Sequence, residues 1–289
     1  MNGILLIDKP AGWTSHDVCA RLRGALHERR IGHSGTLDPM ATGLLVVFVG
    51  RATRAVQFAE THDKTYLTSL RPGVVTDTQD STGTVLSSVP CAVTQAQLET
   101  VLPRFLGEIG QIPPMYSAIK RGGQKLCDVA RRGGAVELQP RPIHVDRINV
   151  LGRDGADWRL EVACGKGTYV RTLCHDIGQA LGCGACMSAL RRTKAGPFCV
   201  EQAYSVEQVL QAAAEDRAEA LLLPVDVLFS EEPALTYDAE QTRRCRNGQE
   251  LPAGAPDGRY RAYAPDGSFL ALVQAENGRV RTIKSFYEV

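Results

Sequence analysis

The sequence lacks long apolar runs and regularly spaced cysteines. No run approaches the ~20 apolar residues that span a bilayer. The segment Met1–Pro10 has no basic region and meets a charge at Asp8, so we expect no signal peptide. The nine cysteines are odd in number and follow no regular spacing, which is typical of reduced thiols. These absences predict a cytoplasmic protein that has no contact with a membrane.

The sequence also lacks a complete metal or cofactor motif. Cys183 and Cys186 form the only Cys-x-x-Cys pair, and no second pair or His-x-x-x-His partner completes the four ligands of a zinc site. The glycine turn Gly165–Arg171 has the wrong glycine spacing for a Walker loop or a dinucleotide fingerprint. The stretch Gly32–Gly35 likewise differs from the nucleophile elbow of hydrolases. We therefore expect no metal and no cofactor.

Charge is unevenly distributed along a chain of ordinary globular composition. The 289 residues are 44% hydrophobic and 22% charged, which suits one large domain with a small one. The formal net charge is only +1, but acids dominate Glu201–Glu240 and cations gather in separate clusters elsewhere. Because Lys and Arg contacts to phosphates supply much of the affinity for nucleic acids, this pattern predicts an RNA-facing protein with an acidic back.

The most distinctive stretch is Gly32–Gly43, which holds three glycines and one carboxylate, Asp38, before Pro39. Glycine allows positive φ and close backbone approach, so the stretch is typical of a loop shaped around a ligand. A second interpretation stays open, because Asp is a favoured helix N-cap and Pro a favoured first helical residue. The apolar run Leu44–Val49 that follows predicts a buried strand.

Apolar periodicity and capping residues predict alternating strands and helices over the first 200 residues. The expected strands are Gly3–Ile7, Leu44–Val49, Lys64–Leu70, Ile143–Leu151 and Trp158–Cys164. The expected helices follow Thr14 or Ser15, cover Ala52–Ala59, open at Thr94, and run from the glycine turn Gly165–Arg171 to about Leu181. The polar segment Thr76–Gly83 is typical of a surface loop.

Two further segments bear on organisation. Gln111–Lys125 carries two prolines, Tyr116 and three cations, Lys120, Arg121 and Lys125, so it is either a linker or an extended arm that contacts a polyanion. After a linker expected near Phe229–Pro233, short alternating runs separated by Asp-Gly and Asn-Gly turns predict a small β-rich module that includes the basic cluster Arg243–Arg246.

The Gly32–Gly43 stretch resembles the catalytic motif of the bacterial tRNA pseudouridine-55 synthases, the TruB family. Other segments match this family in the same order: Asp8–Ser15, Lys64–Tyr66, Thr76–Thr78, Gln111–Ala118, Gly167–Leu173 and Leu190–Thr193. The resemblance covers about residues 1–225, and the tail is similar to the family's PUA-like module. It implies an α/β (α+β) fold with a mixed, largely antiparallel central sheet flanked by helices, a catalytic domain over 1–229 and a PUA-like RNA-binding module over 234–289.

The resemblance also implies roles for single residues in converting one T-loop uridine to pseudouridine. Asp38 matches the catalytic aspartate, Arg171 the arginine that balances its charge, and Tyr66 the tyrosine that packs on the target base. His33 matches the residue that fills the vacated base stack, and Leu190 fits the apolar pocket wall. The candidates for further RNA contacts are Lys9, Tyr116, Lys120, Arg121, Lys125 and the Arg243–Arg246 cluster.

The implied partner is the T-arm of tRNA, bound by a monomer that needs no other protein. Two alternatives remain open. The chain could bind or fold tRNA without chemistry, or it could modify another RNA, alone or guided by partner proteins.

Overall fold

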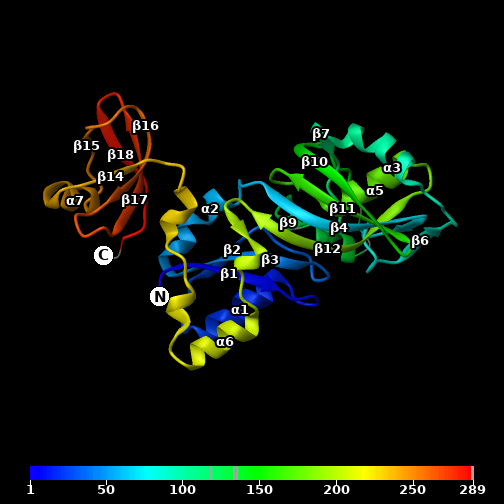
Figure 1. Cartoon of the computed structure of the whole chain (residues 1–289), viewed down its shortest axis with the longest axis horizontal. Coiled ribbons are helices and arrows are strands. Elements are labelled where there is room, and N and C mark those ends of the chain that lie inside the picture. Colours follow the sequence, from blue (N-terminus) through cyan, green and yellow to red (C-terminus); the bar gives the residue numbers. More distant parts are fainter. Residues whose placement is uncertain (118, 133, 135, 288–289) are drawn as a thin grey trace.

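The computed structural model describes residues 1–117, 119–132, 134 and 136–287. One large sheet forms the body of the molecule, and a second, smaller sheet forms a separate module at the opposite end from α3 and α5 (Figure 1). The body sheet has the strand order β1-β3-β12-β4-β11-β10-β7, with β2 added to β3 and β13 to β12. These strands are β1 (Gly3–Lys9), β2 (Ile31–Ser34), β3 (Thr42–Val49), β4 (Lys64–Pro72), β7 (Gly107–Gln111), β10 (Arg141–Asp154), β11 (Asp157–Cys164), β12 (Ala185–Ala195) and β13 (Phe198–Cys199).

The sheet is mixed and largely antiparallel, which confirms the predicted fold class. The parallel pairing joins β12 to β3 through Arg191↔Thr42 and Arg192↔Gly43, and it connects the two halves of the sheet. Gly43 is required at this junction because a Cβ there would lie 2.3 Å from the carbonyl oxygen of Arg192. The glycine loop therefore enters the sheet at its central seam.

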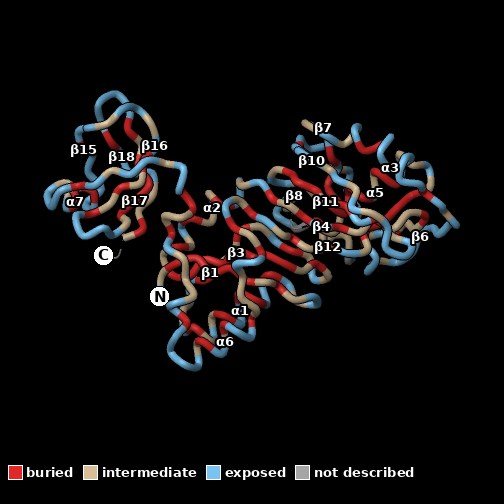
Figure 2. The backbone as a smooth tube through the Cα atoms, viewed as in Figure 1, coloured by how far each residue is buried: buried red, intermediate tan, exposed pale blue. Residues whose placement is uncertain are grey.

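The first half of the sheet is buried on both faces. Alternate residues of β1 and β3 pack on α1 (Ser15–Ala25) and α6 (Val206–Ala214) on one side, and on a cluster containing Phe229 on the other. This explains their continuous apolar runs, and Figure 2 shows the buried backbone following these two strands. Thr14 caps α1, with a capping box to Asp17.

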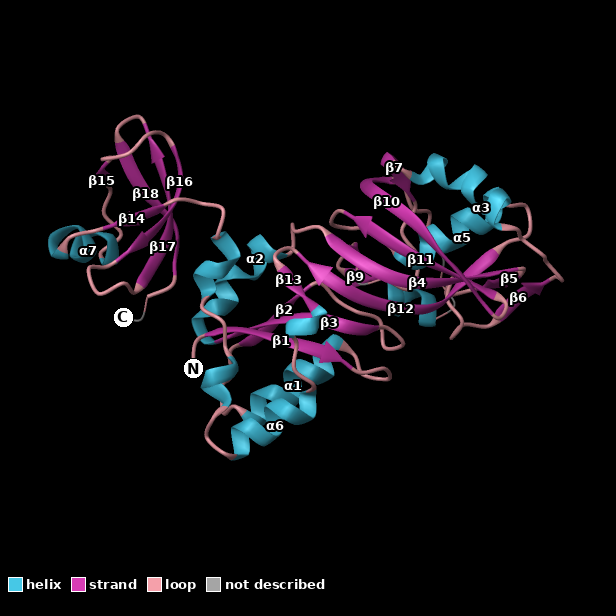
Figure 3. Cartoon of the chain, viewed as in Figure 1, coloured by secondary structure: helices cyan, strands magenta, loops and turns pink. Residues whose placement is uncertain are grey.

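The second half of the sheet, from β12 through β4, β11 and β10 to β7, is covered on one face by helices and loops. Helix α5 (Val170–Ala180) packs there with α3 (Gln95–Val101) and the 3-10 helix η2 (Leu102–Phe105), and Thr94 caps α3 as expected. Figure 3 shows α3 and α5 beside the strands of this part of the sheet. On the opposite face, Leu67 of β4 is 38% exposed. A hairpin of β5 (Val74–Thr76) and β6 (Val85–Ser88) extends from this end.

The C-terminal module is a five-stranded sheet with its own apolar core, as predicted. Its elements are β14 (Ala234–Thr236), α7 (Ala239–Arg246), β15 (Leu251–Pro252), β16 (Gly258–Tyr263), β17 (Phe269–Glu276) and β18 (Arg279–Ser285). The linker prediction is wrong at Phe229, which is buried in η5 (Val225–Phe229) and contacts Phe58, Phe269 and Phe286 at ring distances of 5.3, 6.2 and 5.9 Å. These rings attach the module to the body.

Other predictions need correction. Ala52–Ala59 is a 3-10 helix, η1 (Gly50–Ala55), followed by the short α2 (Val56–Ala59). The stretch Leu190–Thr193, for which the sequence predicted no secondary structure, lies in strand β12. The 112–132 arm contains β8 (Lys120–Arg121), β9 (Gln124–Lys125) and α4 (Leu126–Arg131), and the remaining short helices are η3 (Val200–Gln202) and η4 (Ala218–Leu221). Within the described residues, no helix has the length and apolar character to cross a membrane.

Candidate active site

The segment from Gly35 to Ala41 is an irregular loop between β2 and β3. No helix begins at Asp38, so the N-cap interpretation is wrong: Pro39 and Met40 form a turn, and the Ala41 amide donates to the Asp38 carbonyl at 3.0 Å. The start of α1 holds the loop, because the Ser15 hydroxyl accepts a 2.9 Å hydrogen bond from the Leu37 amide. The loop thus presents Asp38 from a fixed backbone.

The structure brings Asp38 and Arg171 together from positions far apart in the sequence. The Nη2 atom of Arg171 lies 3.2 Å from Asp38 Oδ1 and donates a 2.8 Å bond to the Tyr116 carbonyl. The arginine side chain is 7% exposed and the aspartate side chain 31%. Burial raises the pKa of Asp38, and the positive charge of Arg171 opposes that rise. The result is a partly exposed carboxylate with a buried counter-charge.

A second carboxylate, Asp80, lies behind the arginine. Its Oδ2 is 3.6 Å from Arg171 Nη1, and its Oδ1 accepts bonds from the Thr78 hydroxyl at 2.8 Å and the Thr82 amide at 3.0 Å. The prediction of a surface loop over Thr76–Gly83 is therefore wrong at Asp80, which is 3% exposed. The loop folds inward because its backbone pairs with Met187 at the edge of β12. The sequence offers no feature that separates Asp80 from the exposed Asp77.

A small pocket of about 100 Å³ opens beside Asp38. Its lining residues are Thr36, Leu37, Asp38, Tyr66, Thr168, Tyr169, Val170, Arg171 and Leu190. Four of the residues that the sequence analysis selected thus line one cavity. Tyr66 and Leu190 come from the adjacent strands β4 and β12, and both are at least nine-tenths buried. The pocket joins apolar walls to a single carboxylate, which suits a flat polar ring.

Lys9 does not lie where a phosphate contact would be. Its side chain is fully buried, and its ammonium donates to the carbonyls of Trp13 at 2.6 Å, Pro10 at 2.8 Å and Pro39 at 3.4 Å. Burial lowers the pKa of Lys9 to about 8, and the nearby charge of Asp38 acts in the opposite direction. The expectation of a surface role is corrected: Lys9 supports the loop beneath Asp38.

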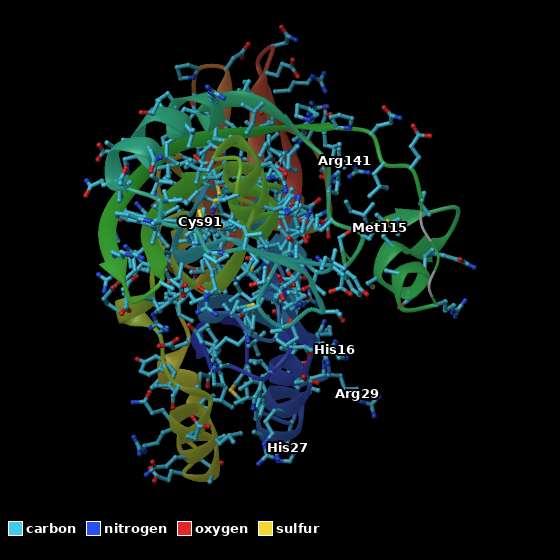
Figure 4. All side chains as sticks on the ribbon, turned by 90° about the vertical axis from the view of Figure 1, so that its right-hand side faces the viewer. His16, His27, Arg29, Cys91, Met115 and Arg141 are labelled. Carbon is cyan, nitrogen blue, oxygen red and sulfur yellow. The ribbon has the colours of Figure 1, made fainter. Side chains whose placement is uncertain are left out.

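The other RNA-contact candidates are more scattered. His33 lies in β2, half-buried, and burial followed by the charge of Arg192 lowers its pKa. Tyr116 is half-buried at the base of the arm. The arm projects from the body beyond Met115, and His16 and Arg29 lie on the same side of the molecule (Figure 4). The backbones of Lys120, Arg121 and Lys125 belong to β8 and β9, but their side chains lie outside the described part of the structure.

The Arg243–Arg246 cluster lies in α7, at the far end of the molecule from α5 (Figure 1). Arg243 is paired with Glu240 at 2.7 Å, and Arg244 donates to the Glu250 carbonyl.

Over the part of the chain that the structure describes, no group of three His, Cys, Asp or Glu side chains could hold a metal ion. The site near Asp38 consists of two carboxylates, Asp38 and Asp80, two cations, Arg171 and Lys9, and the small pocket.

Comparison with known proteins identifies the family. The TruB family pseudouridylate synthase N-terminal domain matches residues 23–170, the tRNA pseudouridylate synthase B C-terminal domain matches 171–230, and the tRNA pseudouridine synthase II C-terminal domain matches 233–287. The tRNA pseudouridine synthase B of Stutzerimonas stutzeri is 43% identical over 97% of this chain and 94% of its own length. That of Ralstonia pickettii is 46% identical over 87% of this chain and 80% of its own.

Solved structures contain chains with a similar fold. The chain is similar to one in a Cbf5-Nop10-Gar1 complex, with a TM-score of 0.75 and 28% identity over 99% of this chain and 85% of the other. A chain of an H/ACA RNP bound to a substrate RNA containing 2'-deoxyuridine gives a TM-score of 0.75 and 26% identity, with 99% and 85% covered. The matches span the whole fold, including the loop that carries Asp38, and this chain belongs to the TruB family of pseudouridylate synthases.

Proposed function

We propose that this protein converts the uridine at position 55 in the T-loop of tRNA to pseudouridine, with Asp38 as the catalytic nucleophile or base. The observation that carries the proposal is the Asp38–Arg171 pair beside a pocket lined by Tyr66 and Leu190, in a chain of the TruB family. The reaction breaks the N1–C1′ bond and joins C5 to C1′. No atom is gained or lost overall, so the chemistry depends on positioning and charge.

The geometry supports this role for Asp38. Arg171 holds one carboxylate oxygen, Oδ1, while Oδ2 accepts no hydrogen bond from any residue that the structure describes. The second oxygen is therefore left for the nucleoside. Burial raises the carboxyl pKa, and the buried guanidinium opposes this rise, so Arg171 favours the ionised form that a nucleophile or base needs beside an apolar wall.

The target base must leave its stack to reach so small a pocket, which costs a few kcal/mol of unstacking. We propose that Tyr66 and Leu190 pack against the extruded ring and that His33 fills the space it leaves. The arm and the Arg243–Arg246 cluster are the proposed phosphate contacts. We further propose that the protein acts as a cytoplasmic monomer without an obligate protein partner.

A second candidate function is modification of an RNA chosen by partner proteins. It is favoured by one observation, the similarity to chains solved in a Cbf5-Nop10-Gar1 complex and an H/ACA RNP. Pseudouridine mapping of unmodified tRNA and of a bare T-arm stem-loop, each incubated with the purified chain alone, separates the two. One new pseudouridine in the T-loop supports the proposal. Modification only when other proteins are added supports the guided alternative, and tight binding without modification supports a non-catalytic binder.

Removing the charge of Asp80 should slow the reaction. Asp80→Asn keeps the side-chain shape but loses the negative charge beside Arg171 Nη1. We expect the single-turnover rate to fall about tenfold, equivalent to about 1.4 kcal/mol of barrier. Asp80 also raises the pKa of Asp38, so the acid limb of the rate should move to lower pH in the variant. Asp77→Asn, in the same loop and exposed, is the control. Equal effects of the two changes would contradict a role for Asp80 at the site.

Lys9 should give the rate an alkaline limb. At pH 7 its ammonium is charged, and the proton is lost as the pH rises through about 8. Asp38 then loses a nearby positive charge and the loop loses a hydrogen-bond donor, so the single-turnover rate should fall above that pH. The contribution of Lys9 to stability should change the other way. Between pH 8 and 10.5 the unfolded chain binds more protons than the folded protein, so the free energy of unfolding should rise as the pH rises. A limb with the same midpoint in Lys9→Met would refute the assignment.

A further inference from the structure

The wall of the pocket that carries Arg171 begins at an unusual helix start. The segment Thr168–Arg171 lines the pocket where the chain enters α5. Tyr169 is the N-cap residue of this helix, and its side chain makes no capping hydrogen bond. Helices usually begin at Ser, Thr, Asp or Asn, whose side chains accept a bond from one of the first backbone amides. The start of α5 therefore needs support from another part of the chain.

Gln111, the last residue of β7, supplies this support. Its Oε1 accepts a 2.8 Å hydrogen bond from the Tyr169 amide, and its Nε2 donates to the Tyr169 carbonyl at 3.1 Å. The same carbonyl accepts the Leu173 amide at 3.0 Å within α5. Gln111 is 3% exposed, and a buried amide is costly unless hydrogen bonds replace those it made with water. The glutamine side chain thus holds the backbone of Tyr169 through both its N–H and its C=O.

Gln111 also lies at the base of the arm. In the register of β7 and β10 it is the partner of Arg141, so the chain leaves the sheet after Gln111 and returns to it at Arg141. The arm meets α5 again at Tyr116, whose carbonyl accepts the 2.8 Å bond from Arg171 Nη2. The side chain of Gln111 therefore joins the base of the arm to the residue two positions before Arg171.

The position of this helix start determines how Arg171 meets Asp38. Arg171 is the second residue of α5, and its Nη2 lies 3.2 Å from Asp38 Oδ1. Its Nε is buried and has no hydrogen-bond partner among the described residues. The guanidinium is therefore placed by the contacts of its two Nη atoms and by the backbone that carries it. A displacement of about 1 Å at a reacting group can cost about 100-fold in rate, so the backbone must be held firmly.

We propose that Gln111 is a positioning residue that fixes Tyr169 and the start of α5, so that the guanidinium of Arg171 stays against Asp38. It thereby ties the base of the arm to the pocket. Gln111 does not itself line the pocket, so it acts through Tyr169 and Arg171. The inference rests on the proposed function, because it concerns the carboxylate that is proposed to react.

Gln111→Met tests the proposal, because methionine has a similar length but makes neither hydrogen bond to Tyr169. The single-turnover rate at saturating tRNA should fall between about 10- and 100-fold at pH 7. The Kd for tRNA should stay unchanged, because the backbone at the base of the arm keeps its pairing with β10. In an Arg171→Lys background, Gln111→Met should cause little further loss, since both changes act on the same contact.

The pH dependence of the rate separates positioning from a general structural effect. Burial raises the pKa of Asp38, and the charge of Arg171 opposes that rise. If Arg171 moves away in Gln111→Met, the opposition weakens and the carboxyl pKa rises further. The acid limb of the rate should therefore move to higher pH, the direction opposite to that expected for Asp80→Asn.

Gln208→Met is the matched control. Gln208 also binds the backbone at a helix start, where its Oε1 accepts the Ser205 amide at 2.7 Å, but the helix is α6. This variant should change neither the rate nor the acid limb. If Gln111→Met does not fold, Gln111→Asn decides, since its side chain is one methylene shorter and should not reach Tyr169.

Three results would overturn the proposal. A folded Gln111 variant with a normal rate would show that the two hydrogen bonds are not needed. A slow variant with an unmoved acid limb would reduce Gln111 to a structural role, and full additivity with Arg171→Lys would show that it does not act through Arg171. Absence of pseudouridine with the unmodified protein would instead count against the proposed function.

Discussion

Asp38→Asn is expected to abolish pseudouridine formation while leaving the fold and tRNA binding intact. The amide matches the carboxylate in shape but can neither attack as an anion nor accept a proton as a base. Loss of a catalytic nucleophile typically costs at least about 10⁴-fold in rate. The measurement is pseudouridine mapping after prolonged incubation, with filter binding of the same tRNA. A modification level near that of the unmodified protein would show that Asp38 is not the reacting group.

The same substitution should not destabilise the protein at neutral pH. Burial raises the pKa of Asp38 above its ordinary value, so the folded state binds the proton of this carboxyl more tightly than the unfolded chain does. The contribution of this group to stability therefore improves as the pH falls from neutral through the raised pKa, and an amide resembles the protonated form at every pH. Arg171 keeps its bond to the Tyr116 carbonyl and its contact with Asp80. Thermal unfolding at pH 7 should show an unchanged or higher Tm for Asp38→Asn, and a large decrease would contradict this account.

Arg171→Lys is expected to cause the second-largest loss, about 10²- to 10³-fold in single-turnover rate. The guanidinium reaches three groups at once: Asp38 at 3.2 Å, the Tyr116 carbonyl at 2.8 Å and Asp80 at 3.6 Å. A lysine ammonium keeps the charge but lacks the planar fork that spans these positions. The buried ammonium would also leave acceptors unpaired, which adds to the cost.

The loss should affect binding as well as the chemical step. Since the Tyr116 carbonyl is an anchor of the arm, the Kd for tRNA should rise in Arg171→Lys but stay unchanged in Asp80→Asn, which does not touch the arm. Arg147→Lys is the matched control, because Arg147 is 53% exposed and pairs with Glu161 on the surface. A normal rate in Arg171→Lys would mean that charge alone suffices at this position.

Local features of the sequence determined most of the fold. The apolar runs Gly3–Ile7 and Leu44–Val49 predicted the strands β1 and β3, and Thr14 and Thr94 predicted helix starts, because caps and periodicity act within a few residues. The Gly32–Gly43 motif and its family resemblance selected Asp38, Tyr66, Arg171 and Leu190, which the structure gathers in one pocket. Their catalytic roles stay predictions.

Only the tertiary structure decided which charges are buried. Lys9, Asp80 and Arg192 look like surface residues in the sequence, because an ionisable side chain is buried only when distant partners compensate it. Those partners come from other parts of the chain: Asp80 meets Arg171 through the fold, and Arg192 meets Gly35 and Tyr66 across the central seam of the sheet. Phe229 likewise looks like a linker residue in the sequence, because its ring partners Phe269 and Phe286 lie in the C-terminal module. Such contacts depend on how strands pair over long separations, which no local pattern encodes.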